Sequence, residues 1–226
     1  MDKKKLKNKL TNAIQLNYFE EVKSLIKQGA DVNAKYPFNY TPLTYASCLN
    51  NSKIAKLLIE HGADVNAENI VNATPLMFAT GCDSPNVAKL LIEHGAKVDA
   101  KDKIKQTSLM TTAGNGSIDV AKLLIKKGAD VNAKNTINQT ILMLAISRNH
   151  INIAKLLVKN KADINAKDNE NETPLMYAAK YNSMEIAKLL IKQGADVNAK
   201  NKKGQTASTI AKETNKEIIE FLGKKE

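Results

Sequence analysis

The residues of this chain that could support catalysis or metal binding are few and widely spaced. They include three histidines, His61, His94 and His150, and two cysteines, Cys48 and Cys82. A zinc ion needs several such ligands close around it, and no histidine recurs beside either cysteine at the spacing of a zinc site or a catalytic Cys–His pair. We therefore predict no metal, no cofactor and no catalytic residue, and we do not expect an enzyme.

Each of these residues also fits a structural role. His61 and His94 occupy the same place before a glycine, where the ring suits the dipole at a helix C-terminus. Cys48 and Cys82 are interpreted as small surface residues near helix ends, without a disulfide, and redox sensitivity is the alternative. Four aspartates recur at one loop position, where carboxylates accept hydrogen bonds from local amides. They are Asp64, Asp130, Asp163 and Asp196.

The elements that position these residues follow a strict repeat of 33 residues. The repeats open at Thr41, Thr74, Thr107, Thr140 and Thr173. A period in this range is typical of a solenoid, in which each repeat buries its apolar face only against its neighbours. Solenoids mostly present a surface, which favours a binding function over catalysis.

Each repeat is predicted to contain two helices and a finger-like connection. Thr41 followed by Pro42 is the pattern of an N-cap and a first helical residue that needs no donor. The second helix, as in residues 54–59, carries apolar residues on one stripe with lysine outside. A glycine such as Gly62 ends this helix, and a polar, turn-forming stretch then leads to the next threonine.

The repeated motif resembles the ankyrin repeat. Thr-Pro-Leu, an alanine at the sixth place, then Lys-Leu-Leu and Gly-Ala-Asp-Val-Asn-Ala carry the resemblance. It implies an all-α, ankyrin-type helical solenoid with projecting β-hairpin-like fingers, which binds partners on its concave face and fingertips. We predict a single domain at 8–223, between a basic N-terminal tail at 1–7 and a C-terminal tail at 224–226. Its repeats run 8–40, 41–73, 74–106, 107–139, 140–172, 173–205 and 206–223.

Some positions depart from the family pattern. The family usually has histidine after Thr-Pro-Leu, and here most repeats have methionine, for which we expect packing in the core. Lys161 replaces the helix-ending glycine, and Lys105 replaces the asparagine of the finger turn. If both backbones are left-handed, each lysine costs about 1–2 kcal/mol relative to glycine. We therefore predict that the third to fifth repeats are the least stable.

The net charge of +11 leaves an alternative function open. Electrostatic binding of nucleic acid or an acidic membrane surface would use this charge. However, Arg148 is the only arginine, the lysines are dispersed over every repeat, and no row of aromatics is available to stack bases. Abundant Lys and Asn at the expense of Arg also reflect an AT-rich genome. We do not expect a nucleic-acid partner.

The sequence also bears on the compartment. No apolar run approaches the length of a transmembrane span, and the N-terminus lacks the apolar core of a signal peptide. Two isolated cysteines favour a reducing compartment, so we expect a cytoplasmic monomer. A lone ankyrin-type array with this composition resembles proteins of host-associated bacteria that act on host partners. Secretion as a host-directed effector without a cleaved signal peptide therefore stays open.

The candidate binding surface lies where the repeats differ. Three residues before each opening threonine, at the fingertip, the chain has Phe38, Val71, Ile104 and Ile137, followed by Glu170 and Lys203. Exposed apolar strips tend to be interaction sites, although fingertips that merely pack on one another are the alternative. The fingertip residues, together with one recurring position near the end of each first helix, predict a surface that binds a protein or an extended peptide. The predicted contact residues are Tyr36, Phe38, Tyr40, Leu49, Ile70, Val71, Cys82, Ile104, Asn115, Ile137, Arg148 and Tyr181.

Overall fold

The computed structural model describes residues 2–211 and 216–223. Within these ranges the chain forms fourteen α-helices and one short 3-10 helix, with an isolated bridge between Lys134 and Thr140 in place of a sheet. The all-α fold class is confirmed. The predicted C-terminal tail at 224–226 and positions 212–215 of the last repeat lie outside the described residues.

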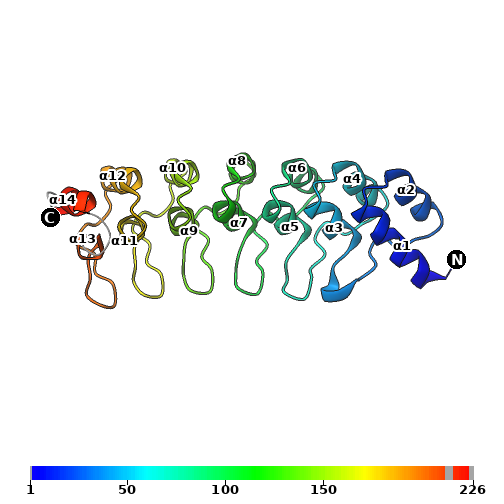
Figure 1. Ribbon diagram of the computed structural model, residues 1–226, viewed down its shortest axis with the longest axis horizontal. Helices are drawn as coiled ribbons and strands as arrows, with labels where there is room; N and C mark the ends of the chain where they lie inside the picture. Colours follow the sequence, from blue (N-terminus) through cyan, green and yellow to red (C-terminus); the bar gives the residue numbers. More distant parts are fainter. Residues whose placement is uncertain (1, 212–215, 224–226) are drawn as a thin grey trace. The chain divides into compact units, whose positions relative to one another are not determined.

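The first compact unit comprises residues 1–112 and 126–128. Its complete helices are α1 (Lys3–Gln15), α2 (Phe19–Lys27), α3 (Pro42–Cys48), α4 (Ser52–Glu60), α5 (Pro75–Gly81) and α6 (Pro85–Glu93). The 3-10 helix η1 (Pro37–Asn39) lies in the first finger. Within this unit α1, α3 and α5 form one row and α2, α4 and α6 form another, so each repeat contributes a pair of antiparallel helices (Figure 1).

The second compact unit comprises residues 113–125 and 129–226. The division falls within α7 (Ser108–Asn115) and again at the end of α8 (Ile118–Lys126). The remaining helices are α9 (Ile141–Ser147), α10 (Ile151–Lys159), α11 (Pro174–Lys180), α12 (Met184–Lys192), α13 (Ala207–Ala211) and α14 (Lys216–Gly223). Here α9, α11 and α13 pack in one row, and α10 packs on α12.

Threonine side chains cap the first helices as predicted. The Oγ1 atom of Thr41 accepts a hydrogen bond from the amide of Thr44 at 3.3 Å. Thr74, Thr107, Thr140 and Thr173 accept the same bond from Met77, Met110, Met143 and Met176. Those methionine side chains are at most 6% exposed, which confirms that they pack in the core.

The turns after the first helices are left-handed, as the residue types there predict. The φ angles are 50° at Asn50, 49° at Asp83, 88° at Gly116, 58° at Asn149 and 54° at Asn182. Asparagine, aspartate and glycine tolerate this conformation better than other residues. It lets the chain reverse into the second helix within two or three residues.

Two lysines adopt the same conformation without that tolerance. Lys105 has φ 60° and Lys161 has φ 64°, so both backbones are left-handed, which is the condition on which the expected cost depends. Each replaces a residue type that adopts this conformation at lower cost. The lower stability expected for the third to fifth repeats stays a prediction.

Asparagine and aspartate side chains join successive repeats at the base of the fingers. Asn66 donates from Nδ2 to the Gly95 carbonyl at 3.1 Å and accepts at Oδ1 from the Lys97 amide at 2.8 Å. Asn33, Asn132 and Asn165 make the same pair of bonds. The recurrent aspartates accept bonds from amides two residues ahead, as predicted: these are Asp64, Asp130, Asp163 and Asp196.

The N-terminal segment differs from the predicted tail at 1–7, because the first helix begins at Lys3. The Asp2 side chain caps this helix by accepting a bond from the Lys4 amide at 3.4 Å. Leu6 is only 6% exposed, so the apolar stripe of the helix extends further toward the N-terminus than the repeat pattern indicated. The Tyr36 hydroxyl also donates to the Lys7 carbonyl at 2.7 Å, which ties this segment to the first finger.

Candidate functional site

Five aromatic side chains of the first compact unit lie together around the first finger. We define the aromatic cluster as Tyr36, Phe38, Tyr40, Tyr45 and Phe78. Edge-to-face contacts join the rings of Tyr36 and Tyr45 at 5.7 Å, Tyr40 and Tyr45 at 5.9 Å, and Tyr40 and Phe78 at 5.2 Å. Such pairs add stability beyond the area they bury. The cluster fixes the first finger against α3 and α5.

Tyr36 is the buried member of this cluster and offers little surface to a partner, contrary to its prediction as a contact residue. It is 9% exposed, and the Lys7 ammonium lies 5.0 Å from the centre of its ring. Burial raises the pKa of the Tyr36 phenol above its ordinary value. The sequence could not separate Tyr36 from its exposed neighbours, because its burial depends on how α1 packs beside the finger.

Phe38 is the most exposed large apolar side chain described, at 64% of its surface. Its backbone is left-handed, with φ 60° and ψ 20°, which is unusual for a bulky residue and costs free energy. The Tyr36 amide donates to the Tyr40 carbonyl at 2.8 Å and closes the turn around it. The other fingertip residues have no such positive φ, so the first finger presents its aromatic side chain in a geometry of its own.

Backbone hydrogen bonds join the fingertips of the first compact unit and leave their side chains accessible. The Ile70 amide donates to the Phe38 carbonyl at 3.0 Å, and the Lys103 amide donates to the Val71 carbonyl at 2.9 Å. Ile70 and Val71 are each 45% exposed, and Ile104 is 52% exposed. The row is therefore held by its backbone while about half of each apolar side chain faces solvent.

The fingertips of the second compact unit change from apolar to charged. Ile137 is 52% exposed, and its carbonyl accepts a bond from the Asn169 amide at 3.0 Å. At the next fingertip, the Glu170 carboxylate lies 3.9 Å from the Lys202 ammonium, and both side chains are exposed. In the sequence Glu170 and Lys203 follow Ile137 at this fingertip position, and in the structure Glu170 pairs with Lys202, the residue before Lys203.

The predicted register on the first helices is exposed in both compact units. In the first, Leu49 is 49% exposed and follows Cys48. In the second, Asn115 and Arg148 are exposed, and Tyr181 is 44% exposed with its ring 6.0 Å from that of Tyr177. These residues are accessible to a partner, and their role as contacts stays a prediction.

The cysteines correct the expectation of two unpaired thiols, because Cys48 and Cys82 form a disulfide. Cys48 is the last residue of α3, and Cys82 follows the end of α5. Since α3 packs on α5, their neighbouring ends bring the two α-carbons to 5.2 Å. The separation of 34 residues is one repeat plus one position, so a strict comparison of equivalent positions missed the pair.

Tyr45 and Phe78 are cluster members that the predicted contact set omitted. They share one position of the first helix, four residues before Leu49 and Cys82 respectively. Residues four apart lie on the same face of a helix, so the register already chosen indicated them. Both side chains are partly exposed.

A small apolar pocket of about 240 Å³ opens beside the cluster in the first compact unit. It is lined by Ala73, Met77, Phe78, Gly81, Cys82, Asp102, Gln106 and Thr111. Met77, Phe78 and Cys82 contribute to its lining, and Asp102, Gln106 and Thr111 are its polar residues. An apolar side chain of a partner matches this lining.

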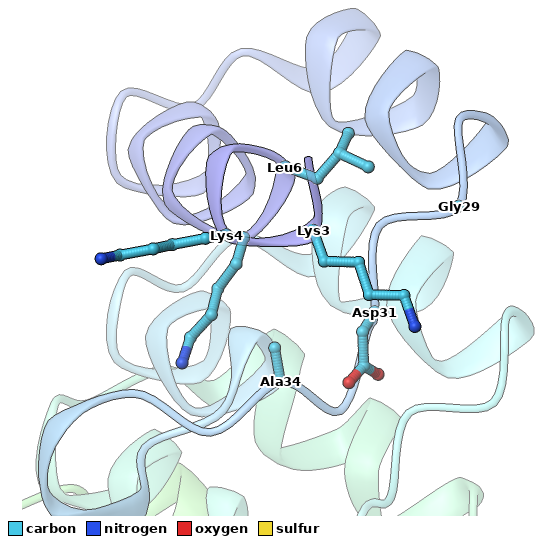
Figure 2. Close-up of a pocket in the computed structure, with 7 residues that line it drawn as sticks. Lys3, Lys4, Leu6, Gly29, Asp31 and Ala34 are labelled. Atoms are coloured by element: carbon cyan, nitrogen blue, oxygen red, sulfur yellow. The ribbon is translucent and has the colours of Figure 1, made fainter. Parts of the chain in front are cut away.

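A larger pocket of about 630 Å³ lies where α1 meets the loop after α2. Its lining residues include Lys3, Lys4 and Asp31, and Figure 2 shows the Lys3 ammonium and the Asp31 carboxylate on the same side of it. With Lys7, three lysines face one aspartate, so the pocket is net positive, but its lining contains no aromatic side chain and no fingertip residue. We therefore place the candidate site at the aromatic cluster, the fingertips Ile70, Val71 and Ile104, and the apolar pocket.

His61 and His94 lie at the C-terminal ends of α4 and α6. Nδ1 of His61 lies 2.9 Å from the Leu57 carbonyl, and Nδ1 of His94 lies 2.9 Å from the Leu90 carbonyl. Both are C-cap residues, as the structural interpretation predicted. Among the residues that the structure describes, no group of three or more histidine, cysteine, aspartate or glutamate side chains could hold a metal ion.

The paired helices, threonine caps and joined fingers define a helical repeat protein. The sequence model of the ankyrin repeat family matches residues 10–102, 98–168 and 160–226. The chain therefore belongs to the ankyrin repeat family and has its solenoid fold. The crystal structure of the human ASB11 ankyrin repeat domain is similar, with a TM-score of 0.86 and 25% identity. The match covers 96% of this chain and 97% of that one. No curated protein matches the chain.

The helices give no sign of a membrane span. No described helix combines the length and the apolar character that crossing a bilayer requires.

Proposed function

We propose that this protein is a non-enzymatic scaffold that binds a protein or an extended peptide through the first compact unit. The carrying observation is the coincidence of the aromatic cluster, three half-exposed fingertips and an apolar pocket on neighbouring repeats. Ankyrin repeats are in general protein-interaction modules, which supports the same function. Because backbone bonds already join the fingertips, docking would order few side chains and so lose little entropy.

The partner that fits this surface presents apolar side chains. Phe38 and Ile104 would bury their exposed area against it, and one of its side chains would enter the pocket beside Phe78. Aromatic residues packed in this way are commonly the points of highest binding energy in an interface. Arg148 and the exposed lysines would steer an acidic region of the partner rather than fix it.

Affinity capture with the immobilised full chain tests this proposal. Replacing Phe38 and Ile104 by alanine should lower capture of the bound protein at least about tenfold, the equivalent of about 1.4 kcal/mol. The matched control is Tyr18→Ala, since Tyr18 is 54% exposed but lies outside the candidate site. Circular dichroism should show the same helicity for all three proteins. Equal capture by the double variant and the control would refute the site.

Electrostatic binding of nucleic acid or an acidic membrane surface is the second candidate. Several lysines of the second helices already face acidic neighbours: Lys56 lies 3.8 Å from Glu60, and Lys89 lies 4.0 Å from Glu93. These local pairs reduce the field that a polyanion would meet. Binding through charge should fall steeply as salt rises, whereas apolar docking should persist. A salt series in the capture assay therefore separates the two functions.

A further inference from the structure

The Cys48–Cys82 disulfide is accessible to small molecules. Both residues are exposed, and the bond lies at neighbouring ends of α3 and α5. Thiol attack on a disulfide requires access to a sulfur atom, and exposed disulfides are the ones that exchange readily. The position of this bond therefore differs from that of a buried structural cross-link.

The two helices are held together independently of the sulfur atoms. Leu43 and Ala46 of α3 and Leu76 and Ala79 of α5 are all fully buried, at 0% exposure. This packing would keep the two cysteines close after reduction, because the apolar contacts do not involve the bond. The α-carbon separation of 5.2 Å lies within the range in which a disulfide closes without backbone movement.

The bond also lies within the candidate site. Cys82 lines the apolar pocket together with Phe78, and Cys48 precedes the exposed Leu49. Tyr45 on α3 and Phe78 on α5 both contact Tyr40. A covalent link between the neighbouring ends of α3 and α5 thus joins the two helices that carry Tyr45 and Phe78.

We propose that Cys48 and Cys82 form a reversible thiol–disulfide site whose substrates are low-molecular-weight thiols and disulfides, with glutathione as the probe. Its oxidation fixes α3 against α5, the helices that carry Tyr45 and Phe78 of the aromatic cluster. The exchange chemistry stands without any partner. Only its effect on docking rests on the proposed function.

The reaction proceeds in two balanced exchanges. One protein thiolate attacks a sulfur of glutathione disulfide, forms a mixed disulfide and releases one glutathione thiolate. The second protein thiolate then attacks the protein sulfur of that mixed disulfide, forms the Cys48–Cys82 bond and releases the second glutathione. Two protein thiols are oxidised, and one glutathione disulfide is reduced to two thiols. Excess glutathione reverses both steps.

Equilibration of the full chain in buffers of defined glutathione to glutathione-disulfide ratio tests the chemistry. After acid quenching and alkylation with a maleimide, gel shift and mass spectrometry count the free thiols. We expect two thiols to disappear together in one transition, with full reversal by excess glutathione and unchanged helicity. Thiols that stay free at every ratio, a stable glutathione adduct, or a bond that is reduced only after denaturation would overturn the proposal.

Single variants and hydrogen exchange test the specific pairing and its structural effect. Cys48→Ser and Cys82→Ser should each accumulate the mixed disulfide instead of closing a bond. In the unaltered chain, amides of α3 and α5 should exchange at least about threefold more slowly when oxidised, while those of α10 and α12 stay unchanged. Equal exchange of α3 and α5 in the two redox states would overturn the claim that the bond fixes them. All of these measurements are made without a partner, so failure to capture one leaves them intact.

Discussion

The first and second compact units repeat the same helix pairs but carry different chemistry at their variable positions. The first has an aromatic cluster, apolar fingertips and a disulfide between α3 and α5. The second has a fingertip ion pair between Glu170 and Lys202 and an exposed arginine, Arg148. The repeated positions, such as the capping threonines, serve the fold in both, so differences in binding must come from the positions that vary.

Two tyrosines at equivalent positions of their repeats illustrate this difference between the units. Tyr45 and Tyr177 occupy the same place in their repeats, 132 positions apart in the chain. Tyr45 is partly exposed and packs by its ring against Tyr36 and Tyr40. Tyr177 is 6% exposed, and its hydroxyl donates to Asp168 at 2.9 Å and accepts from Gln139 at 3.1 Å. The same residue type serves a surface in one unit and a buried polar network in the other.

Among the variants that test the difference between the two units, Gly116→Ala should lose the most stability. The first compact unit has side chains at the equivalent positions, Asn50 and Asp83, but a Cβ on Gly116 would lie 2.9 Å from the His150 ring. Gly116→Ala should therefore cost about 3 kcal/mol, from left-handed strain and displacement of that ring. Urea unfolding measures the loss.

Gly194→Ala is the matched control for this prediction. Gly194 has φ 89°, close to the 88° of Gly116, and nothing lies within 4 Å of its Cβ position. It should cost only about 1–2 kcal/mol. Adding His150→Ala to Gly116→Ala should recover part of the difference. Equal costs for the two glycine variants would show that the ring contact has no energetic role.

Tyr177→Phe should have the next largest effect, a loss of about 1–2 kcal/mol, because Asp168 and Gln139 lose a buried partner. Tyr45→Phe should change stability by less than about 0.5 kcal/mol, since Tyr45 packs by its ring. Denaturant unfolding of both variants at neutral pH checks the pair. Similar losses would contradict the different roles assigned to one register.

The Tyr177 network also predicts a pH dependence. Burial, followed by the bond to Asp168, raises the pKa of the Tyr177 phenol well above its ordinary value. The neutral form is thus favoured in the folded state, so its stabilisation is complete below about pH 10 and is lost as pH rises further. Tyr177→Phe should therefore lose less stability between neutral and alkaline pH than the unaltered chain does.

Much of this fold could be predicted from the sequence because its determinants are local. The threonine caps, the left-handed turns at Asn50 and Asp83, and the strain at Lys161 each depend on residues a few positions apart. The 33-residue repeat then places these caps and turns at equivalent positions along the chain. Most of the exposed contact residues were also identifiable, because they occupy slots in which the repeats differ.

The remaining features depend on packing between elements. Tyr36 is buried because α1 covers it, and the start of α1 at Lys3 lies outside the repeat pattern. The Cys48–Cys82 bond depends on a one-residue offset between neighbouring helix ends. Periodicity compares equivalent positions, and so it cannot show which non-equivalent positions meet.

Lys161→Gly, unlike the variants above, should stabilise the chain. Glycine adopts φ 64° without the cost that lysine bears there, so we expect a gain of about 1 kcal/mol. Lys105→Gly, at φ 60° in the first compact unit, should give a similar gain. Lys159→Gly, at the last residue of α10, is the control and should not stabilise the chain, because glycine is a poorer helix former than lysine. Urea midpoints rank the three, and a loss at Lys161 would show that its backbone carries no strain.

The smallest expected effect couples the disulfide to docking and depends on the proposed function. If the bond preorganises the aromatic cluster, the oxidised chain should capture its partner about threefold more tightly than the reduced chain. The Cys48→Ser, Cys82→Ser double variant should match the reduced chain in either buffer. Because Glu170 and Lys203 lie in the second compact unit, replacing both by alanine should leave this redox ratio unchanged. A ratio near one in the unaltered chain would leave the disulfide as a cross-link without influence on binding, whereas a shift caused by the fingertip variant would mean that the two units do not act separately.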